Sequence, residues 1–345
     1  MLNKIKNRID LELDKFISRL DKAYSLNKLS PLLFNNIKNF LLRDGKRARP
    51  ILFVIGFMGF AKKIPRGLYT SALSLELLHD FMLVHDDIID KSDTRRGKPS
   101  MHVLLNQSLK KFKKTKFSGQ DLAIVVGDVM YALSINAFLA IDVNFARKEK
   151  ALKRFVDAAI YTGSGEFIEI LYGAEKIDKI NKNNIYRIYD YKTAFYTFAC
   201  PLSIGAILAG ANNSEIDKLF EIGMYLGRAF QIKDDILGMF AEEKETGKST
   251  TSDLQEGKRT ILIWKAYNKC KYEDRLKIKE MFSQKKITKK DLTIMRDIIT
   301  KSGALSYAEN EIKTLTHKVQ KLILSSKLNQ NYKKTLLYYS NKILS

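Results

Sequence analysis

The chain has 345 residues, 45% of them apolar, and a formal net charge of +22. An apolar share of this size is ample for a core and excludes a disordered chain. With only 5 prolines and 18 glycines, the composition favours long helices over many short strands. The charge predicts an acidic partner: nucleic acid, an anionic membrane surface and diphosphates all fit, although no nucleic-acid fold signature accompanies it.

The first third of the chain alternates between helical patterns and loops. Segment 44–50 is predicted to be a loop, with Pro50 opening the helix that follows, and segment 92–118 to be a break that carries a run of lysines. Helices are predicted around these loops over 1–23, 31–43, 51–61 and 66–91.

The rest of the chain is also predicted to be helical. A polar stretch, 241–257, is expected to be a long ordered loop, and 258–345 to form several more amphipathic helices. No linker is long enough to separate two domains, so we predict one all-α domain over 1–345, with a core at about 40–265 and C-terminal helices at 266–345. Helical patterns precede the polar stretch at 120–140, 146–174, 183–210 and 214–239.

Targeting features are missing from the sequence. No stretch approaches 18 uncharged apolar residues, so no segment is expected to span a membrane. The amphipathic N-terminus does not have the pattern of a secretory signal. Cys200 and Cys270 lack metal-site spacing, and we interpret them as two reduced thiols of a cytoplasmic protein.

Two acidic clusters end apolar helices about 150 residues apart. Asp86 and Asp90 are four residues apart and would share one helix face, while Asp234 and Asp235 lie in the second cluster. Like charges at this spacing weaken an isolated helix unless a cation lies between them. Mg²⁺ prefers oxygen ligands and is usually held by one or two carboxylates together with substrate phosphate oxygens. The two clusters therefore predict a magnesium site for a phosphorylated substrate.

Cations accompany both clusters, and diphosphates are bound by Arg forks and Lys point charges. Any one of these cations is more often a surface charge. Lys192 is the exception because it lies in an aromatic and apolar segment. The others are Lys46, Arg49, Arg95, Arg96, Lys248 and Lys258.

Taken in order, these motifs resemble the trans-type isoprenyl diphosphate synthases, and their pattern is most similar to geranylgeranyl and farnesyl diphosphate synthases of archaeal type. The resemblance runs from about residue 40 to 265 and is carried by GKRARP at 45–50, ELLHDFMLVHDDIID at 76–90, RRGKP at 95–99, VGD at 126–128, KT at 192–193, GRAFQIKDDIL at 227–237 and GKSTTSDLQEGKRT at 247–260.

The resemblance implies an all-α isoprenoid synthase-type bundle around a deep central cavity, normally a homodimer. It implies a head-to-tail prenyltransferase that joins isopentenyl diphosphate to an allylic diphosphate, with three Mg²⁺ per site and Mn²⁺ able to substitute. A carbocation is formed as diphosphate leaves, which requires that water be excluded. We expect the 241–258 loop to close over the bound diphosphate for this purpose.

The family's residue roles transfer to matching positions of this sequence. As metal ligands the resemblance implies Asp86, Asp90 and Asp234, with Asp87 and Asp235 accessory. For isopentenyl diphosphate it implies Gly45, Lys46, Arg49, His79 and Arg96. For the allylic diphosphate and the reacting carbons it implies Arg95, Lys192, Thr193, Gln231, Lys248 and Lys258.

Product length is expected to depend on side chains one or two turns before Asp86, because one helical turn rises about 5.4 Å, comparable to one isoprene unit. Phe81, Met82 and Leu78 are the candidates, and ordinary core packing of Phe81 remains open. An aromatic residue at this position favours a C20 product, with farnesyl (C15) or longer products as alternatives.

Four departures from the family pattern are visible: Gly238 ends the second motif where a further Asp is common, Asp44 replaces a glycine, Glu166 stands where many members have Gln, and the 100–120 segment is longer and more basic than usual. Three rival functions also remain. A terpene cyclase would not need Lys46, Arg49 and His79, a non-catalytic subunit of a heteromeric synthase would commonly have lost aspartates or basic residues, and a nucleic-acid-binding protein rests on charge alone.

Overall fold

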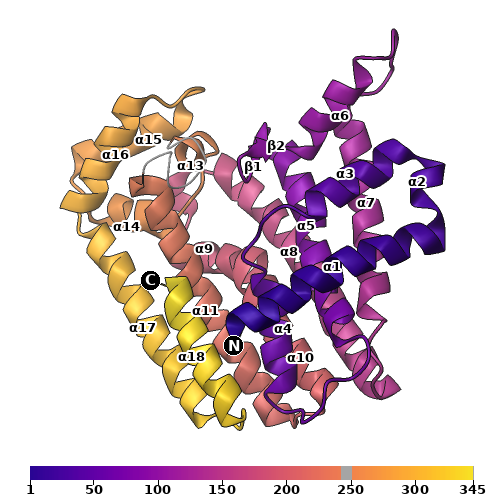
Figure 1. Ribbon diagram of the computed structural model, residues 1–345. Coiled ribbons are helices and arrows are strands. Elements are labelled where there is room, and N and C mark those ends of the chain that lie inside the picture. Colours follow the sequence, from indigo (N-terminus) through magenta and orange to yellow (C-terminus); the bar gives the residue numbers. More distant parts are fainter. Residues whose placement is uncertain (242–250, 345) are drawn as a thin grey trace. The chain divides into compact units, whose positions relative to one another are not determined.

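The computed structural model describes residues 1–241 and 251–344, and the chain forms two compact units (Figure 1). Unit 1 comprises Met1–Leu152 and Ile207–Gly210, and unit 2 comprises Lys153–Ala206 and Ala211–Ser345. Within the described residues the only strands are β1 (Thr94–Arg95) and β2 (Lys98–Pro99), which form one antiparallel hairpin. The all-α prediction is confirmed, whereas the single domain stays a prediction.

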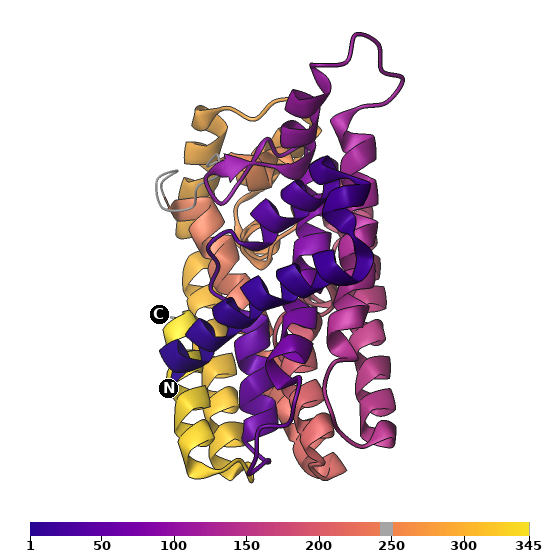
Figure 2. The same cartoon turned by 45° about the vertical axis from the view of Figure 1, so that its right-hand side comes forward.

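Unit 1 is built around α5 (Leu68–Ile89), most of whose side chains are buried. Helix α7 (Gly119–Phe138) packs along α5, and α1 (Leu2–Tyr24) lies against α4 (Ala48–Met58) and α5 (Figure 2). Sequence signals set several helix starts: the Ser118 side chain caps α7 in a capping box, which satisfies first-turn amides. The other helices here are α2 (Leu26–Leu29), α3 (Pro31–Leu41), α6 (Met101–Leu109) and the start of α8 (Phe145–Ala174).

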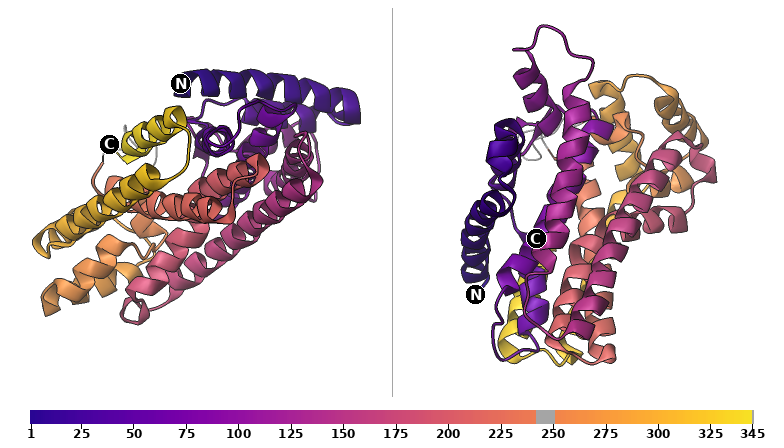
Figure 3. Two further views of the ribbon diagram at one scale, coloured as in Figure 1. Left: turned by 90° about the horizontal axis from the view of Figure 1, so that it is seen from below. Right: turned by 90° about the vertical axis from the view of Figure 1, so that its right-hand side faces the viewer.

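Unit 2 is built around α11 (Asn213–Phe240), which packs against the π-helix η2 (Tyr189–Ala199) and against α17 (Ala304–Ser325). Helix α17 also contacts α18 (Gln330–Leu344), and the pair is visible in both panels of Figure 3. The remaining elements are most of α8 and α10 (Cys200–Ala209), together with η1 (Ile177–Lys179), α9 (Lys182–Ile188), α13 (Ser252–Gln255), α14 (Ile261–Lys269), α15 (Tyr272–Ser283) and α16 (Lys289–Lys301).

Small residues allow η2 to lie close to α11. A Cβ added at Gly227 would lie 2.3 Å from the Cα of Ala194, and one at Gly223 would lie 2.2 Å from the Cα of Ala199. Four residues separate the two glycines, so both face η2 from one side of α11. This contact fixes the segment that carries Lys192 against the helix that carries the second acidic cluster.

The predicted break at 92–118 contains regular structure that the sequence reading missed. Arg96 and Gly97 both have positive φ (56° and 70°), as tight two-residue hairpin turns require, and α6 follows at 101–109. Pro50 lies in the first turn of α4, which begins two residues earlier at Ala48. The expected loop at 241–257 includes the short helix α13, while 242–250 lie outside the described residues.

Two helical stretches are long and apolar enough to cross a membrane by length and hydropathy, namely Gly119–Phe138 and Lys182–Ala209. The sequence predicted no membrane span in either stretch, because each contains charged residues. In the structure 44% and 83% of their apolar windows are buried, and such core helices are weak evidence for a membrane span.

Candidate active site

The first acidic cluster forms the last turn of α5 in unit 1. The Asp90 N–H donates to the Asp86 carbonyl oxygen at 2.8 Å, so the helical spacing that brings these carboxylates to one face is present. Asp86 and Asp90 are half-buried, whereas Asp87 is fully buried and accepts a hydrogen bond from Arg95 Nε at 2.7 Å. Two carboxylates therefore lie toward solvent, and the one between them is neutralised internally.

The β1–β2 hairpin carries Arg95 and Arg96. Arg43, which the sequence reading passed over, holds the hairpin in place by donating to the Pro99 carbonyl at 2.8 Å and to the Arg95 carbonyl at 3.4 Å. Arg95 in turn pairs with Asp87 through both Nε and a terminal nitrogen. The hairpin is thereby attached to the acidic end of α5.

Two of the predicted isopentenyl diphosphate residues, Arg49 and Arg96, lie near a third, His79, in unit 1. Burial and the guanidinium of Arg49, with those of Arg96, Arg95 and Arg47, hold the pKa of His79 well below its usual value, so the imidazole is neutral at pH 7. Arg49 is buried, Gly45 is half-buried and Lys46 is exposed. The cluster is an accumulation of positive charge suited to an anion with several oxygens.

Buried carboxylates balance part of this charge. Arg47 donates to Glu76 at 2.8 Å and to Asp10 at 2.9 Å, and it also contacts two carbonyl oxygens, so it is a structural residue. Asp80 is fully buried and accepts no hydrogen bond from the described residues, with the Arg96 guanidinium 3.9 Å away. Burial, and then Glu76, raise the pKa of Asp80 to about 8.

The proposed chain-length residues occupy different environments on α5. Leu78 is fully buried and Met82 nearly so, whereas Phe81 is only half-buried. The Phe81 ring lies 4.7 Å from that of His85 and 5.2 Å from that of Tyr131 on α7. Phe81 therefore faces α7 at the surface of the core.

In unit 2, Lys192 projects from the π-helix η2 toward α8. Its Nζ lies 2.5 Å from a Glu166 carboxylate oxygen and also contacts Glu169. π-helical turns are rare and frequent at functional sites. The residue expected to bind diphosphate is thus countered by two carboxylates, one of them the Glu166 that departs from the family pattern.

Thr193 and Gln231 connect this lysine segment to the second acidic cluster. The Thr193 hydroxyl donates to Gln231 Oε1 at 2.6 Å, and Gln231 Nε2 donates to Asp235 at 3.1 Å. Asp234 is exposed and Asp235 is buried. Burial raises the pKa of Asp235 well above its usual range, against the hydrogen bonds from Tyr189 and Gln231, which lower it.

Lys258 follows α13 and pairs with Asp253 at 2.9 Å and Glu256 at 2.8 Å. Asp253 also lies against Gly238, where an added Cβ would be 2.2 Å from its carboxylate oxygen. The glycine that replaces the last Asp of the second motif therefore leaves room for the carboxylate of Asp253. Lys248 and half of the predicted closing loop, residues 242–250, lie outside the described residues.

Besides Arg43, sequence reading missed Asp80, Glu169, Tyr189 and Asp253 in these clusters. Glu169 could have been found, because it is three residues after Glu166 and shares its helix face. No sequence signal separates Asp80 and Tyr189 from ordinary polar positions. Asp253 lies five residues before its partner Lys258, and only its contact with Gly238 depends on the fold.

The described residues fit magnesium by their chemistry. Asp86 and Asp90 offer hard oxygen donors on one face, and Asp234 offers another in unit 2. No three His, Cys, Asp or Glu residues gather into a complete cage in the part of the chain that is described. Mg²⁺ is usually held by one or two carboxylates and completes its shell with water and phosphate oxygens.

The sequence model of one protein family, described as polyprenyl synthetase, matches residues 30–299. The chain belongs to this family. It is accordingly an enzyme of the prenyltransferase type, as the motif resemblance predicted.

Relatives of the polyprenyl synthetase agree with the assignment. A geranylgeranyl diphosphate synthase of Sulfolobus acidocaldarius is 34% identical over 81% of this chain and 80% of that protein. A geranylfarnesyl diphosphate synthase of Aeropyrum pernix is 33% identical over 81% of this chain and 83% of that protein. The crystal structure of a Corynebacterium glutamicum geranylgeranyl pyrophosphate synthase, complexed with isoprenyl diphosphate and magnesium, matches with a TM-score of 0.90 at 24% identity, over 100% and 99% of the two chains.

Proposed function

We propose that this polyprenyl synthetase condenses isopentenyl diphosphate with an allylic diphosphate, releases diphosphate, and makes geranylgeranyl diphosphate (C20). The observation that carries the proposal is the last turn of α5, where Asp86 and Asp90 share a face while Arg95 neutralises Asp87. The same unit holds the arginine cluster around His79. Relatives named for this product support the choice.

We assign the metal-binding role to Asp86, Asp90 and Asp234, with Asp87 and Asp235 supporting them from buried positions. When bound, Mg²⁺ would neutralise charge that develops on the departing diphosphate. Three ions per site are proposed, with Mn²⁺ accepted in their place. Titration of metal against product formation, with Asp234→Asn as the comparison, tests the assignment.

Each cation has a part in the proposed reaction. Arg49, Arg96 and Lys46 hold the isopentenyl diphosphate, with Gly45 contributing backbone and neutral His79 donating a hydrogen bond. Arg95, Lys192, Lys248 and Lys258 bind the allylic diphosphate, and Thr193 and Gln231 line the reacting carbons. The double bond of isopentenyl diphosphate attacks the allylic carbocation, and the departing diphosphate takes the proton. No separate acid–base pair is required.

The test is an incubation of purified protein with radiolabelled isopentenyl diphosphate, Mg²⁺ and each allylic starter separately, followed by sizing of the dephosphorylated products. A single C20 alcohol is expected. Shorter or longer products would keep the reaction and discard the chain length. No product from any starter, with folded protein, would support the alternative of a non-catalytic subunit of a heteromeric synthase.

Phe81 provides a variant test of product length. If its ring ends the space for the growing chain, Phe81→Ala will lengthen the products by one or more isoprene units. Leu83→Ala is the matched control, because Leu83 is also a buried residue of α5, lies two positions away on another face of the helix, and is not a chain-length candidate. An unchanged product profile in Phe81→Ala would remove Phe81 from this role.

We propose that the enzyme is a homodimer formed through α8. In unit 2 this helix exposes a row of large apolar side chains, with Ile160 58%, Phe167 66% and Leu171 54% exposed. The spacings of seven and four residues put them on one face. Such an apolar row, left exposed by the described residues, suits a second copy of the same surface.

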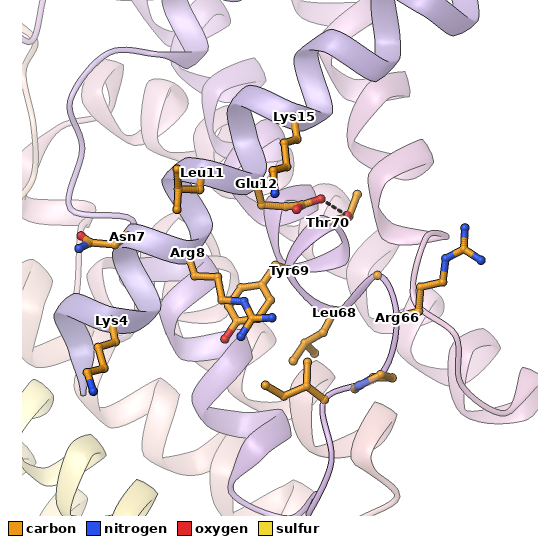
Figure 4. A pocket seen from close by; sticks show the side chains of 13 residues that line it. Lys4, Asn7, Arg8, Leu11, Glu12, Lys15, Arg66, Leu68, Tyr69 and Thr70 are labelled. Carbon is orange, nitrogen blue, oxygen red and sulfur yellow. Dashed lines mark hydrogen bonds between the residues drawn. The ribbon is translucent and has the colours of Figure 1, made fainter.

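We place the enzyme in the cytoplasm, in weak contact with a membrane surface. Its two cysteines are free, as in a reducing compartment. In unit 1, a cavity of about 740 Å³ beside α1 is lined by Lys4, Arg8, Lys15 and Arg66 (Figure 4). None of the predicted site residues lines it. Sedimentation with vesicles rich in anionic lipid, compared with neutral vesicles, tests the contact, and equal binding to both would contradict it.

A further inference from the structure

Tyr189 joins the second acidic cluster to the start of α14. It is the first residue of η2 and is buried, and its hydroxyl donates to a carboxylate oxygen of Asp235. The same hydroxyl oxygen accepts the Ile261 N–H at 2.9 Å. A phenol can donate one hydrogen bond and accept another, so both capacities are used.

The second carboxylate oxygen of Asp235 extends this set of hydrogen bonds to Gln231. This oxygen accepts from Gln231 at 3.1 Å, and Gln231 accepts from Thr193 at 2.6 Å. A continuous chain of hydrogen bonds therefore runs from Thr193 on η2, through α11, to the first amide of α14. Thr193 and Gln231 are proposed to line the reacting carbons, whereas no contact with substrate is proposed for Tyr189.

The hydrogen bond from Ile261 to Tyr189 matters because Ile261 lies close to Lys258 in the chain. Ile261 is the first residue of α14, and it follows Lys258 by three residues. First-turn amides of a helix have no partner within the helix, so the phenol supplies one that water cannot reach here. Asp235 adjoins Asp234, the proposed metal ligand. One hydroxyl thus sets the distance between the second acidic cluster and the segment that carries Lys258.

We propose that Tyr189 is a positioning residue, which holds the carboxylates of the second acidic cluster in register with Lys258 without touching substrate. The inference rests on the proposed function for its kinetic consequences, but the hydrogen-bond link is testable alone. A purely structural tyrosine would affect stability and leave turnover and metal response unchanged.

The test compares Tyr189→Phe with Tyr186→Phe. Tyr186 is a matched control: it lies one turn earlier, its ring is 5.9 Å from that of Tyr189, and its hydroxyl donates to Glu311 at 2.5 Å, a carboxylate with no proposed role in the reaction. Four quantities are measured: hydrogen exchange at the Ile261 amide, the Mg²⁺ concentration that half-saturates the rise in Tm with inorganic pyrophosphate, kcat, and KM for isopentenyl diphosphate.

For Tyr189→Phe we expect at least about 10-fold faster exchange at Ile261 and a rise of about 10-fold in half-saturating Mg²⁺, with kcat lower by about 10- to 100-fold, as for outer partners of metal ligands. KM for isopentenyl diphosphate should stay within about 3-fold, because other residues hold that substrate. Tyr186→Phe should change none of these quantities.

A lower Tm with unchanged kcat and unchanged half-saturating Mg²⁺ would overturn the proposal. If Tyr189→Phe does not fold, the wild-type protein decides, because fast exchange at its Ile261 amide would exclude the link. Should the wild type make no product from any starter, the proposed function fails, while the exchange and Tm measurements still decide on Tyr189.

Discussion

At the scale of single residues, a buried polar group can have a pKa that its position in the sequence does not predict. Asp80 is the plainest example: it is a fully buried carboxyl without a hydrogen-bond donor among the described residues, next to three arginines. Burial outweighs the attraction of the arginines and raises its pKa to about 8. The group is therefore neutral in the folded protein at pH 7 and ionised in the unfolded chain.

This carboxyl predicts how stability depends on pH. Between about pH 4 and pH 8 the unfolded chain loses the Asp80 proton while the folded protein keeps it, so stability falls as pH rises through that window. Asp80→Asn removes the group. The free energy of unfolding of both proteins is measured with urea at pH 5 and at pH 8. From pH 5 to pH 8, the free energy of unfolding of the variant relative to that of the wild type should rise by about 2–4 kcal/mol. A constant difference at both pH values would contradict the raised pKa.

Gly238 predicts a second effect at this scale. Because a methyl group there would lie 2.2 Å from the Asp253 carboxylate, Gly238→Ala should displace Asp253 and with it the Lys258 that pairs with it. We expect kcat to fall by about 10-fold or more, as when a residue that supports a functional side chain from behind is displaced. Leu237→Ala is the control, because Leu237 is exposed. Unchanged turnover in Gly238→Ala would show that Asp253 can move without cost.

At the scale of elements, the contact between η2 and α11 matters most, because it places Lys192 and Thr193 beside the second acidic cluster. The backbone approach at Gly227 leaves no room for a side chain. A shift of the π-helix would move both Lys192 and the Thr193 hydroxyl, which donates to Gln231. The stability of this packing and the geometry of the site are therefore linked.

Gly227→Ala tests that link. Overpacking a helix contact of this kind costs about 1–3 kcal/mol, so Tm should fall even though alanine is the better helix former. Asp217→Ala on the exposed side of α11 should change stability by less than about 0.5 kcal/mol. Thermal unfolding measures both variants. A Gly227→Ala variant more stable than the wild type would mean that the two helices separate easily.

At the scale of the whole molecule, the proposed dimer predicts the effect of a charge on α8. Phe167→Asp would place a carboxylate in the middle of the apolar row, where a second copy would have to bury it unpaired. Light scattering after size-exclusion chromatography should give a dimer for the wild type and a monomer for the variant. Tyr272→Asp is the control, an equally exposed aromatic on α15. A dimeric Phe167→Asp protein would place the interface elsewhere.

The sequence by itself determined the helical architecture, the positions of most helices, and the ordered motifs that assign the family. Helical periodicity and caps are local, and the i, i+4 spacing of Asp86 and Asp90 fixes their common face without any tertiary information. The hairpin at 94–99 and α6 were not predicted, because they lie in a segment rich in lysine and turn residues whose pattern is typical of a loop. Only the tertiary structure decided which residues support the site, because partners distant in the chain make those contacts. Asp80 has no hydrogen-bond donor within the part of the chain that is described, Asp253 fills the space over Gly238, and Tyr189 contacts Asp235 across 46 residues and Ile261 across 72.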